Sequence, residues 1–371
     1  MLRKHYRLGD QEKRFNPGSD YRGEWIQRGE SLSDIVKTVT AQYFPFHDEL
    51  VDAIVELDDY WPQDGGGPLW DETQNYVLRP TYSDDPGEEW RLAAEELKHS
   101  RRFFSPRAYE LFGDLFADVG KLELGAGRRR QLVVDALPAG TGFFRARVCA
   151  SMSAIKAVIA DAAAQVGPPP AESAKAGRMN AEGVIALYVA LNEDTARAEV
   201  RPAIGNDVAV IRLESIERLK VLDFERLERA TAINRLSLFQ PDYDEKLKRH
   251  WLLHMLHHLV SQPVVPGREA DYLMTQMMGE YLNQVHEEKF DGVKFSSVQH
   301  AGGTNVVLFN RTTAQGTLEE RFAVQFVPGS LKFSRTTGVK YSHAAVDYVD
   351  TLGGGPLVTV HDGYGNDEIE F

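Results

Sequence analysis

The sequence predicts an α+β fold in two parts, a mainly helical N-terminal domain of residues 1–130 and a mixed α/β domain of residues 131–371. The chain has 371 residues, and two domains are expected because single hydrophobic cores stop growing at roughly 250–300 residues. Apolar residues recur with helical spacing in the first part. The second part runs from strands to two long helices and back to strands, an order typical of a mixed domain and not of a doubly wound parallel sheet.

Four helices are expected in the N-terminal part. Residues 31–43 and 48–57 carry apolar side chains three and four positions apart, and the stretch Ser31-Leu-Ser-Asp can cap the first helix. Two further helices are predicted at residues 88–99 and 106–119. The Gly- and Arg-rich residues 125–130 indicate a linker into the second domain.

The second part alternates short β-branched runs with long helical patterns. Strands are predicted where Val, Ile and aromatic residues dominate, and the two helices are separated by Pro263 and Pro266. The expected strands are 142–148, 184–191, 208–213, 219–224, 292–297, 305–309 and 320–327, and the expected helices are 242–260 and 269–287. No GxGxxG or GxxxxGK[ST] motif occurs, which excludes the Rossmann and P-loop interpretations.

Composition excludes several classes of function. The formal net charge is −13, from 42 basic and 55 acidic side chains, which argues against a general affinity for nucleic acid or an anionic membrane. No apolar run approaches the ~18–20 residues that span a bilayer, and the basic start is not followed by an apolar signal core. Cys149 is the single cysteine, so it forms no intramolecular disulfide, and burial is its expected role. We expect a cytoplasmic protein.

Polar residues capable of chemistry gather around one predicted strand. Arg178 precedes this strand, Tyr188 lies within it, and Glu199 falls in the second turn of the helix that follows, which Asn192 or Asp194 can cap. Upstream, Arg145 and Arg147 alternate along another strand and therefore point to one face.

These residue types suit a ligand with a diphosphate and a cleavable glycosidic bond. Guanidinium groups bind phosphate oxygens bidentately, and a carboxylate stabilises an oxocarbenium-like transition state. The ring of Tyr188 can stack on a flat base. In the alternative interpretation, Arg178 and Glu199 form a structural ion pair and Tyr188 fills the core. The spacing leaves both interpretations open.

From Phe143 to Phe309 the chain resembles the RES domain, the toxin of a class of bacterial toxin–antitoxin systems. Six motifs carry the resemblance, in the family's order and spacing. They are Phe-Arg-Ala-Arg (144–147), Gly-Arg-Met-Asn (177–180), Leu-Tyr-Val-Ala (187–190), Thr-Ala-Arg-Ala-Glu-Val-Arg-Pro (195–202), Tyr-Leu-Met-Thr-Gln (272–276) and Phe-Asp-Gly-Val-Lys-Phe-Ser-Ser (290–297). The family's usual Tyr-x-Ser is Phe295-Ser296-Ser297 here, so Ser297 is the better match for the family serine and Ser296 is the alternative.

The resemblance implies a fold like that of the ADP-ribosyltransferase toxins and the consumption of NAD+, which would be a substrate and not a cofactor. Family members cleave the nicotinamide–ribose bond and transfer ADP-ribose to water, to phosphate or in some cases to a protein. Carried over by motif, the catalytic residues are Arg178, Tyr188, Glu199 and Ser297. The expected NAD+-binding or pocket-shaping residues are Arg145, Arg147, Asn180, Arg201, Gln276 and Ser296.

Three functions follow from this resemblance. The leading one is an NAD+ glycohydrolase or phosphorylase used as a toxin. The alternatives are a mono-ADP-ribosyltransferase with a protein target and an NAD+-binding module without catalysis. The resemblance also implies an Xre-type antitoxin partner, and the sequence leaves open whether the chain forms a homo-oligomer.

Two other features of the sequence bear on function. Residues 88–104 resemble the HEPN-like helical extension that precedes some RES domains, but residues 1–130 lack the Arg-to-His spacing of HEPN ribonucleases, so a regulatory role is expected. His250, His254, His257 and His258 share a helical face without an HExxH frame, so we expect no metal site.

Overall fold

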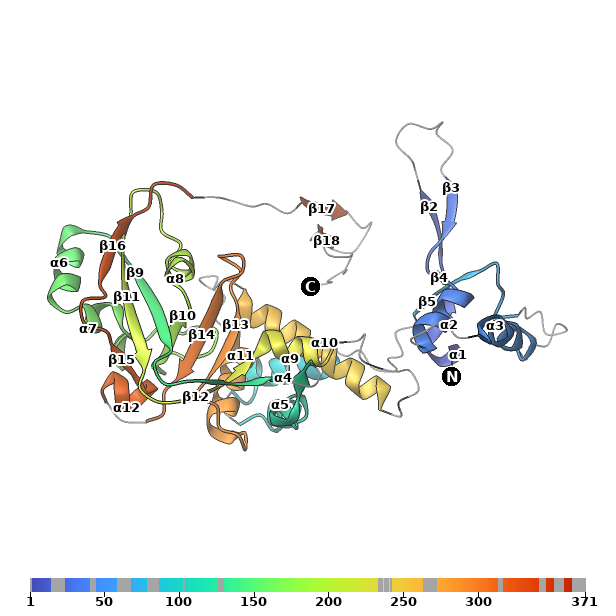
Figure 1. Cartoon of the computed structure of the whole chain (residues 1–371), viewed down its shortest axis with the longest axis horizontal. Coiled ribbons are helices and arrows are strands. Elements are labelled where there is room, and N and C mark those ends of the chain that lie inside the picture. Colours follow the sequence, from blue (N-terminus) through green and yellow to red (C-terminus); the bar gives the residue numbers. More distant parts are fainter. Residues whose placement is uncertain are drawn as a thin grey trace.

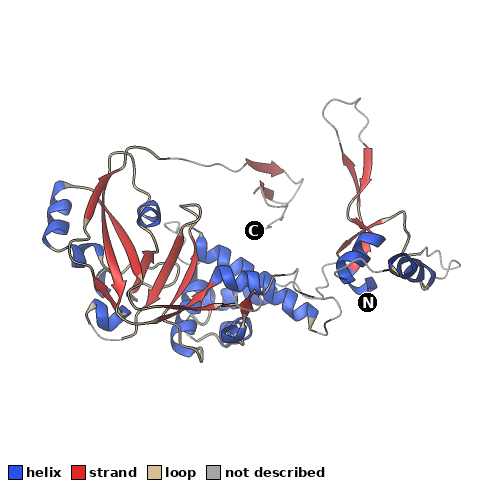
Figure 2. Cartoon of the chain, viewed as in Figure 1, coloured by secondary structure: helices blue, strands red, loops and turns tan. Residues whose placement is uncertain are grey.

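The computed structural model describes residues 2–14, 24–40, 45–58, 68–78, 87–102, 104–125, 130–232, 236, 240, 242–262, 272–312, 316–339, 345–349 and 357–361. Its centre is a curled, mixed sheet of nine strands with helices on both faces (Figures 1 and 2). This architecture confirms the mixed α/β character predicted for the second part of the chain.

The large sheet has the strand order β15-β11-β9-β10-β14-β13-β12-β8, and β16 also pairs with β11. Neighbouring strands are antiparallel except for the parallel pair β12–β13. The strands are β8 (Val134–Leu137), β9 (Gly142–Cys149), β10 (Ala186–Ala190), β11 (Asp207–Ser215), β12 (Leu219–Asp223), β13 (Gly292–Ser296), β14 (Thr304–Phe309), β15 (Val324–Phe326) and β16 (Lys332–Arg335).

Each face of the sheet packs on its own hydrophobic cluster, because successive side chains of a strand point to opposite faces. Along β10, Leu187 and Val189 belong to one cluster, which includes residues of α6 (Met152–Ala160), α7 (Ala162–Val166) and α12 (Leu318–Phe322). Tyr188 packs against the other cluster. That second cluster includes residues of α4 (Glu88–His99), α5 (Pro106–Phe116), α9 (Phe224–Ala230), α10 (Tyr243–Ser261) and α11 (Leu273–Glu280).

Most elements predicted for the second part are present within a few residues. The helix predicted at 242–260 is α10, whereas 269–287 contains α11 followed by the π-helical turn η7 (Tyr281–Val285). The strand predicted at 320–327 is wrong in its first half, which belongs to α12. A capping box joins Thr317 and Glu320 at the start of α12, and Ala323 ends it in the left-handed region with φ 51°. β17 (Ala345–Val349) and β18 (Leu357–His361) form a separate hairpin.

The first 78 residues contain more strand than predicted. Strands β1 (Tyr6–Leu8), β5 (Asn75–Leu78) and β4 (Glu30–Ser31) form a three-stranded sheet, and β2 (Gln11–Arg14) pairs with β3 (Glu24–Gln27). The short helix α1 (Leu2–His5) precedes β1. The two helices expected here are confirmed as α2 (Leu32–Thr40) and α3 (His47–Glu56). The N-terminal part is therefore not mainly helical in this region.

Helices α4 and α5 are not part of this small N-terminal unit. The unit has its own core, which includes Tyr6, Ile35 and Trp70. Trp90 of α4 and Phe112 of α5 instead join the cluster that packs on the large sheet. The hydrophobic core therefore continues across residue 130, although the division into domains at that residue stays a prediction. Residues 126–129 of the predicted linker lie outside the described residues.

None of the helices in the described ranges combines the length and the apolar character that crossing a membrane requires.

We predict that Phe112→Ala lowers the free energy of unfolding by about 3–5 kcal/mol. The Phe112 side chain is fully buried and packs against Trp90, Phe116 and Tyr281, so its removal leaves a cavity between the N-terminal helices and the sheet domain. Urea denaturation measures the change. Phe104→Ala is the matched control, since Phe104 is 87% exposed, and it should change stability by less than about 0.5 kcal/mol. Equal effects of the two variants would contradict the shared core.

Candidate functional site

The candidate site is built on the central strands β10, β14 and β13. Register pairs Ala190 with Asn305 and Asn305 with Phe295, so these three side chains point to the same face of the sheet. Tyr188 lies two residues before Ala190 and points to that face as well. The sheet therefore brings together residues that are more than 100 positions apart in the sequence.

The hydroxyl group of Tyr188 fixes the loop that carries Arg178. It donates a hydrogen bond to Asn180 Oδ1 at 2.8 Å and accepts one from the backbone N–H of Met179 at 3.0 Å. Burial raises the pKa of Tyr188 to about 12, so the phenol is neutral at physiological pH. Both hydrogen bonds of its hydroxyl group are therefore made with the loop, while the Tyr188 side chain stays partly exposed.

Helix α11 holds the same loop from the other side. Thr275 Oγ1 donates to the carbonyl of Arg178 at 2.5 Å, and Gln276 Nε2 donates to the carbonyl of Gly177 at 2.8 Å. A Cβ atom at Gly279 would lie 2.9 Å from the Met179 carbonyl, so only glycine permits this close approach. Asn180 and Gln276 thus shape the loop that carries Arg178.

Arg178 is a buried cation without a carboxylate partner among the described residues. It is 7% exposed, its guanidinium lies over the Phe295 ring at 5.6 Å, and NH1 donates to the Gln262 carbonyl. Its Nε is buried and has no hydrogen-bond partner in the described part of the chain. Burial lowers the pKa of Arg178, while Tyr188 and Glu199 act in the opposite direction. A guanidinium keeps its charge in proteins, so this site favours an anionic ligand.

Glu199 ends helix α8 (Glu193–Glu199) and is held by one oxygen. Ser297 Oγ donates to Glu199 Oε1 at 2.6 Å, and Asn305 Nδ2 donates to the same oxygen at 2.7 Å. No described residue donates to Oε2. The prediction that a cap at residue 192 or 194 starts this helix is confirmed for Asn192, whose Oδ1 accepts from the Thr195 N–H at 2.8 Å.

The turn that follows β13 orients the Ser297 hydroxyl group. Ser297 Oγ accepts from the backbone N–H groups of Gln299 and His300 at 3.2 and 3.1 Å, so its own proton is directed to Glu199. The turn is fixed to α8 a second time, because Thr195 Oγ1 lies 2.8 Å from His300 Nδ1. Thr195 and Glu199 are one helical turn apart, so α8 presents both to this turn.

The structure does not bring Arg145 and Arg147 to this face. Arg145 pairs with Ile211 and Arg147 with Ala209, and both partners belong to the cluster on the opposite face. Arg145 donates to the carbonyls of Val166 and Tyr188 at 2.8 and 2.6 Å, and burial lowers its pKa to about 10. Arg147 donates to Gln165.

Two further predicted residues form no hydrogen bond or ion pair with the Glu199 carboxylate. Ser296 Oγ donates to Glu225 at 3.3 Å, so Ser297, and not Ser296, contacts Glu199. Arg201 is exposed and has a positive φ of 44° just after α8. Positive φ is uncommon for a residue other than glycine, and it marks the sharp end of the helix. The structural ion pair between Arg178 and Glu199 is not formed, although Glu199 is close enough to affect the pKa of Arg178.

Sequence reasoning missed Asn305 and His300. Asn305 is 7% exposed and is the second residue of β14, directly before four apolar residues, so a buried polar side chain at this position could have identified it. His300 gave no such signal, since its role depends on the turn that brings it to Thr195.

The histidine cluster on α10 is organised by a carboxylate from α9. Glu228 accepts from His254 at 2.6 Å and from His257 at 2.5 Å. Burial raises the pKa of Glu228, but these hydrogen bonds outweigh it and lower the pKa to about 2. Within the described ranges no group of three or more His, Cys, Asp or Glu side chains could hold a metal ion. Cys149 is buried, as expected.

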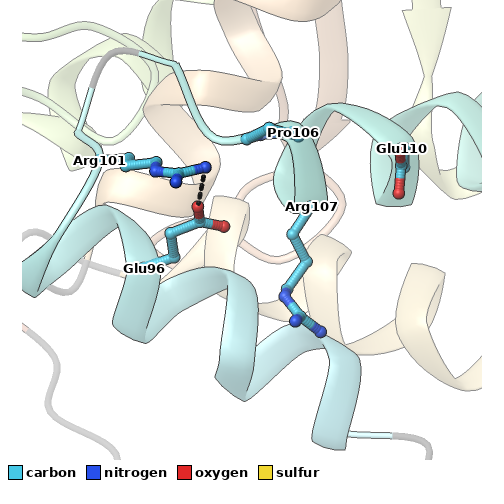
Figure 3. A pocket seen from close by; sticks show the side chains of 5 residues that line it. All are labelled: Glu96, Arg101, Pro106, Arg107 and Glu110. Carbon is cyan, nitrogen blue, oxygen red and sulfur yellow. Dashed lines mark ion pairs between the residues drawn. The ribbon is translucent and has the colours of Figure 1, made fainter.

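Two cavities lie elsewhere. One of about 340 Å³, near the α4–α5 connection, is lined by charged residues and Pro106. Figure 3 shows the Arg101 side chain directed at the Glu96 carboxylate. The other, of about 370 Å³, lies in the N-terminal unit.

Comparison with known families identifies one match. Residues 148–326 match the model of the RES domain family, a range that includes Arg178, Tyr188, Glu199, Ser297 and Asn305. No curated protein matches the chain, and no solved structure matches it.

We predict that Tyr188→Phe lowers the free energy of unfolding by about 1–3 kcal/mol, because the Met179 N–H and the Asn180 Oδ1 both lose their partner. Urea denaturation of the purified variant measures the change. Tyr109→Phe is a suitable control, since Tyr109 is 52% exposed. A Tyr188→Phe chain as stable as the unaltered protein would show that the hydroxyl group does not anchor the loop.

Proposed function

This chain carries a RES domain at residues 148–326, and on that premise we propose that it consumes NAD+ by cleaving the bond between nicotinamide and ribose. ADP-ribose is transferred to water or to phosphate, as in an NAD+ glycohydrolase or phosphorylase used as a toxin. The observation that carries this proposal is the Glu199 carboxylate, which Ser297 and Asn305 hold by one oxygen while the other accepts no hydrogen bond from the described residues.

A fixed carboxylate is the group that this reaction needs. When the glycosidic bond breaks, its electron pair goes to the ring nitrogen, so nicotinamide leaves as a neutral base and needs no proton. Positive charge builds on the anomeric carbon and the ring oxygen of the ribose, and an anion held beside them stabilises it. Because Ser297 and Asn305 fix Glu199 before substrate binds, little reorganisation is needed in the transition state. An oxygen of water or phosphate then bonds to the anomeric carbon, and a proton of the attacking water passes to solvent.

Arg178 would bind the diphosphate. A buried guanidinium without an anionic partner is costly, and phosphate oxygens supply both the charge and the acceptors that it lacks among the described residues. Its loop is fixed by Tyr188, Thr275 and Gln276, so the cation is positioned in advance. This arrangement reduces the entropy lost on binding.

Tyr188 would contribute its ring and not its proton. The hydroxyl group is already bonded to Asn180 and Met179, and its raised pKa keeps it protonated. The partly exposed ring can pack against nicotinamide. Arg145 supports β10 from the opposite face through the Tyr188 carbonyl, and in this proposal it stabilises the strand and does not bind phosphate.

The same premise supports three proposals about the surroundings of the site. The curled sheet would correspond to the fold of the ADP-ribosyltransferase toxins. The protein would act in the cytoplasm. An antitoxin of the Xre type would be its partner, while self-association stays open.

We predict that Glu199→Gln lowers the rate of NAD+ loss by at least about 100-fold, because the amide keeps the shape but lacks the negative charge. The assay incubates pure protein with NAD+, with and without inorganic phosphate, and identifies the products by chromatography. Asp194→Asn on the same helix is the matched control and should leave the rate unchanged, since Asp194 is mostly exposed. Full activity of a folded Glu199→Gln chain would overturn the assignment.

The same assay distinguishes the alternative functions. Retention of label on a protein after incubation with radiolabelled NAD+ would indicate a mono-ADP-ribosyltransferase. Binding of NAD+ without turnover would indicate an NAD+-binding module without catalysis.

We predict that Arg178→Lys raises the NAD+ concentration at half-maximal rate by about tenfold, with a smaller effect on the maximal rate. A lysine keeps the charge but loses the planar fork that binds two phosphate oxygens. Initial rates over a range of NAD+ concentrations separate the two effects. A saturation curve identical to that of the unaltered protein would exclude a role of Arg178 in phosphate binding.

A further inference from the structure

Helix α8 directs a second polar side chain, that of Thr195, at the turn of residues 297–303. Thr195 is fully buried, and its hydroxyl group lies 2.8 Å from Nδ1 of His300. This hydroxyl group has no other hydrogen-bond partner in the part of the chain that the structure describes. A buried hydroxyl group that loses its partner costs free energy, so the contact with His300 is a specific one.

The turn leaves room for this contact by means of a glycine. A Cβ atom at Gly303 would lie 2.3 Å from Thr195 Oγ1 and 3.0 Å from His300 Nδ1. Any other residue would therefore fill the space in which these two atoms meet. The turn is closed by two backbone hydrogen bonds, from Gly303 N–H to the His300 carbonyl at 2.8 Å and from Ser297 N–H to the Gly303 carbonyl at 2.9 Å. One closed turn thus carries both Ser297 and His300.

Two contacts fix α8 to this turn. The Glu199 carboxylate is bonded to Ser297, and Thr195 is bonded to His300 one helical turn earlier, about 6 Å away along the helix axis. A helix that is held at one point can pivot about that point, whereas a helix held at two points cannot. The Thr195–His300 contact therefore restricts the angle at which α8 presents Glu199.

We propose that Thr195 and His300 are positioning residues of the reaction, which hold the Glu199 carboxylate where its charge acts. This inference rests on the proposed function, because it assigns both residues a part in the same site. Glu199 stabilises charge that develops only in the transition state, so a small displacement of its carboxylate lowers kcat. The loop of Arg178 is held by other contacts, so the binding of NAD+ should change little.

The test measures kcat and KM for NAD+ loss in variants of the full-length chain. Thr195→Val keeps the shape of the side chain without its hydroxyl group, and it should lower kcat at least about tenfold while KM changes less than about twofold. Thr195→Ser keeps the hydroxyl group and should retain kcat within about threefold. Gly303→Ala separates the two side chains without removing either, so it should lower kcat like Thr195→Val. A thermal melt checks that each variant is folded.

Two variants of His300 separate positioning from direct chemistry. The amide of His300→Asn lies near the place of Nδ1, and the amide of His300→Gln lies near the place of Nε2. We expect His300→Asn to retain kcat within about threefold and His300→Gln to lose at least about tenfold. The reverse order would overturn the proposal, because Nε2, which bonds no described residue, would then be the atom that acts. If Thr195→Val does not fold, these variants decide, since His300 is only partly buried.

Lys332→Ala is the matched control. It removes a bond between β16 and Glu193 of the same helix at 2.8 Å, but Lys332 is 63% exposed and lies outside the turn. Its kcat should stay within about twofold of the unaltered value. An equal loss in this control would overturn the proposal, because any loosening of α8 would then suffice. An unaltered chain that does not consume NAD+ would overturn the proposed function as well, whereas an active chain with an equally active Thr195→Val variant would overturn this role alone.

Discussion

The hydrogen bonds that converge on Glu199 Oε1 are the interaction on which the candidate site depends. Ser297 follows β13 and Asn305 is the second residue of β14, and these two donors lie 98 and 106 positions from Glu199 in the sequence. Two donors on one oxygen restrict the carboxylate to a single orientation. The same contacts attach α8 to the sheet, so the element that carries the charge cannot move without breaking them.

The buried charge of Arg178 is the complementary constraint. A folded protein tolerates a guanidinium with few acceptors only if its surroundings are fixed, because otherwise the side chain would turn toward water. Here the loop is held by Tyr188 from the strand and by Thr275 and Gln276 from α11. Among the described residues the Arg178 guanidinium has no anionic partner, which lowers the stability of the fold at this place, and an anionic ligand would restore it. Binding sites commonly differ from the rest of a fold in this way.

The sequence predicted most strands of the large sheet, because apolar alternation there is strong. It also singled out Arg178, Tyr188, Glu199 and Ser297, which lie around one face of that sheet. It could not assign Arg145 to a face. A period of two shows that Arg145 and Arg147 point the same way, but only the pairing of β9 with β10 and β11 decides which way that is. The sequence did not predict the N-terminal strands, because β1 and β4 have three and two residues, too few to show an alternation of apolar and polar side chains.

Helix α10 connects the two parts of the molecule through one contact at each of its ends. Its first residue, Tyr243, packs edge-to-face on His5 of the N-terminal unit at 5.1 Å between ring centroids. The residue that follows its last turn, Gln262, accepts the hydrogen bond from Arg178. A helix of 19 residues is about 28 Å long and nearly rigid, so a displacement at Tyr243 would be transmitted to the Arg178 partner. Such a contact becomes regulation only if α10 has two discrete positions that a ligand of the N-terminal unit distinguishes. The Gln262 carbonyl is therefore the atom at which any influence of that unit on the buried cation would first be measurable.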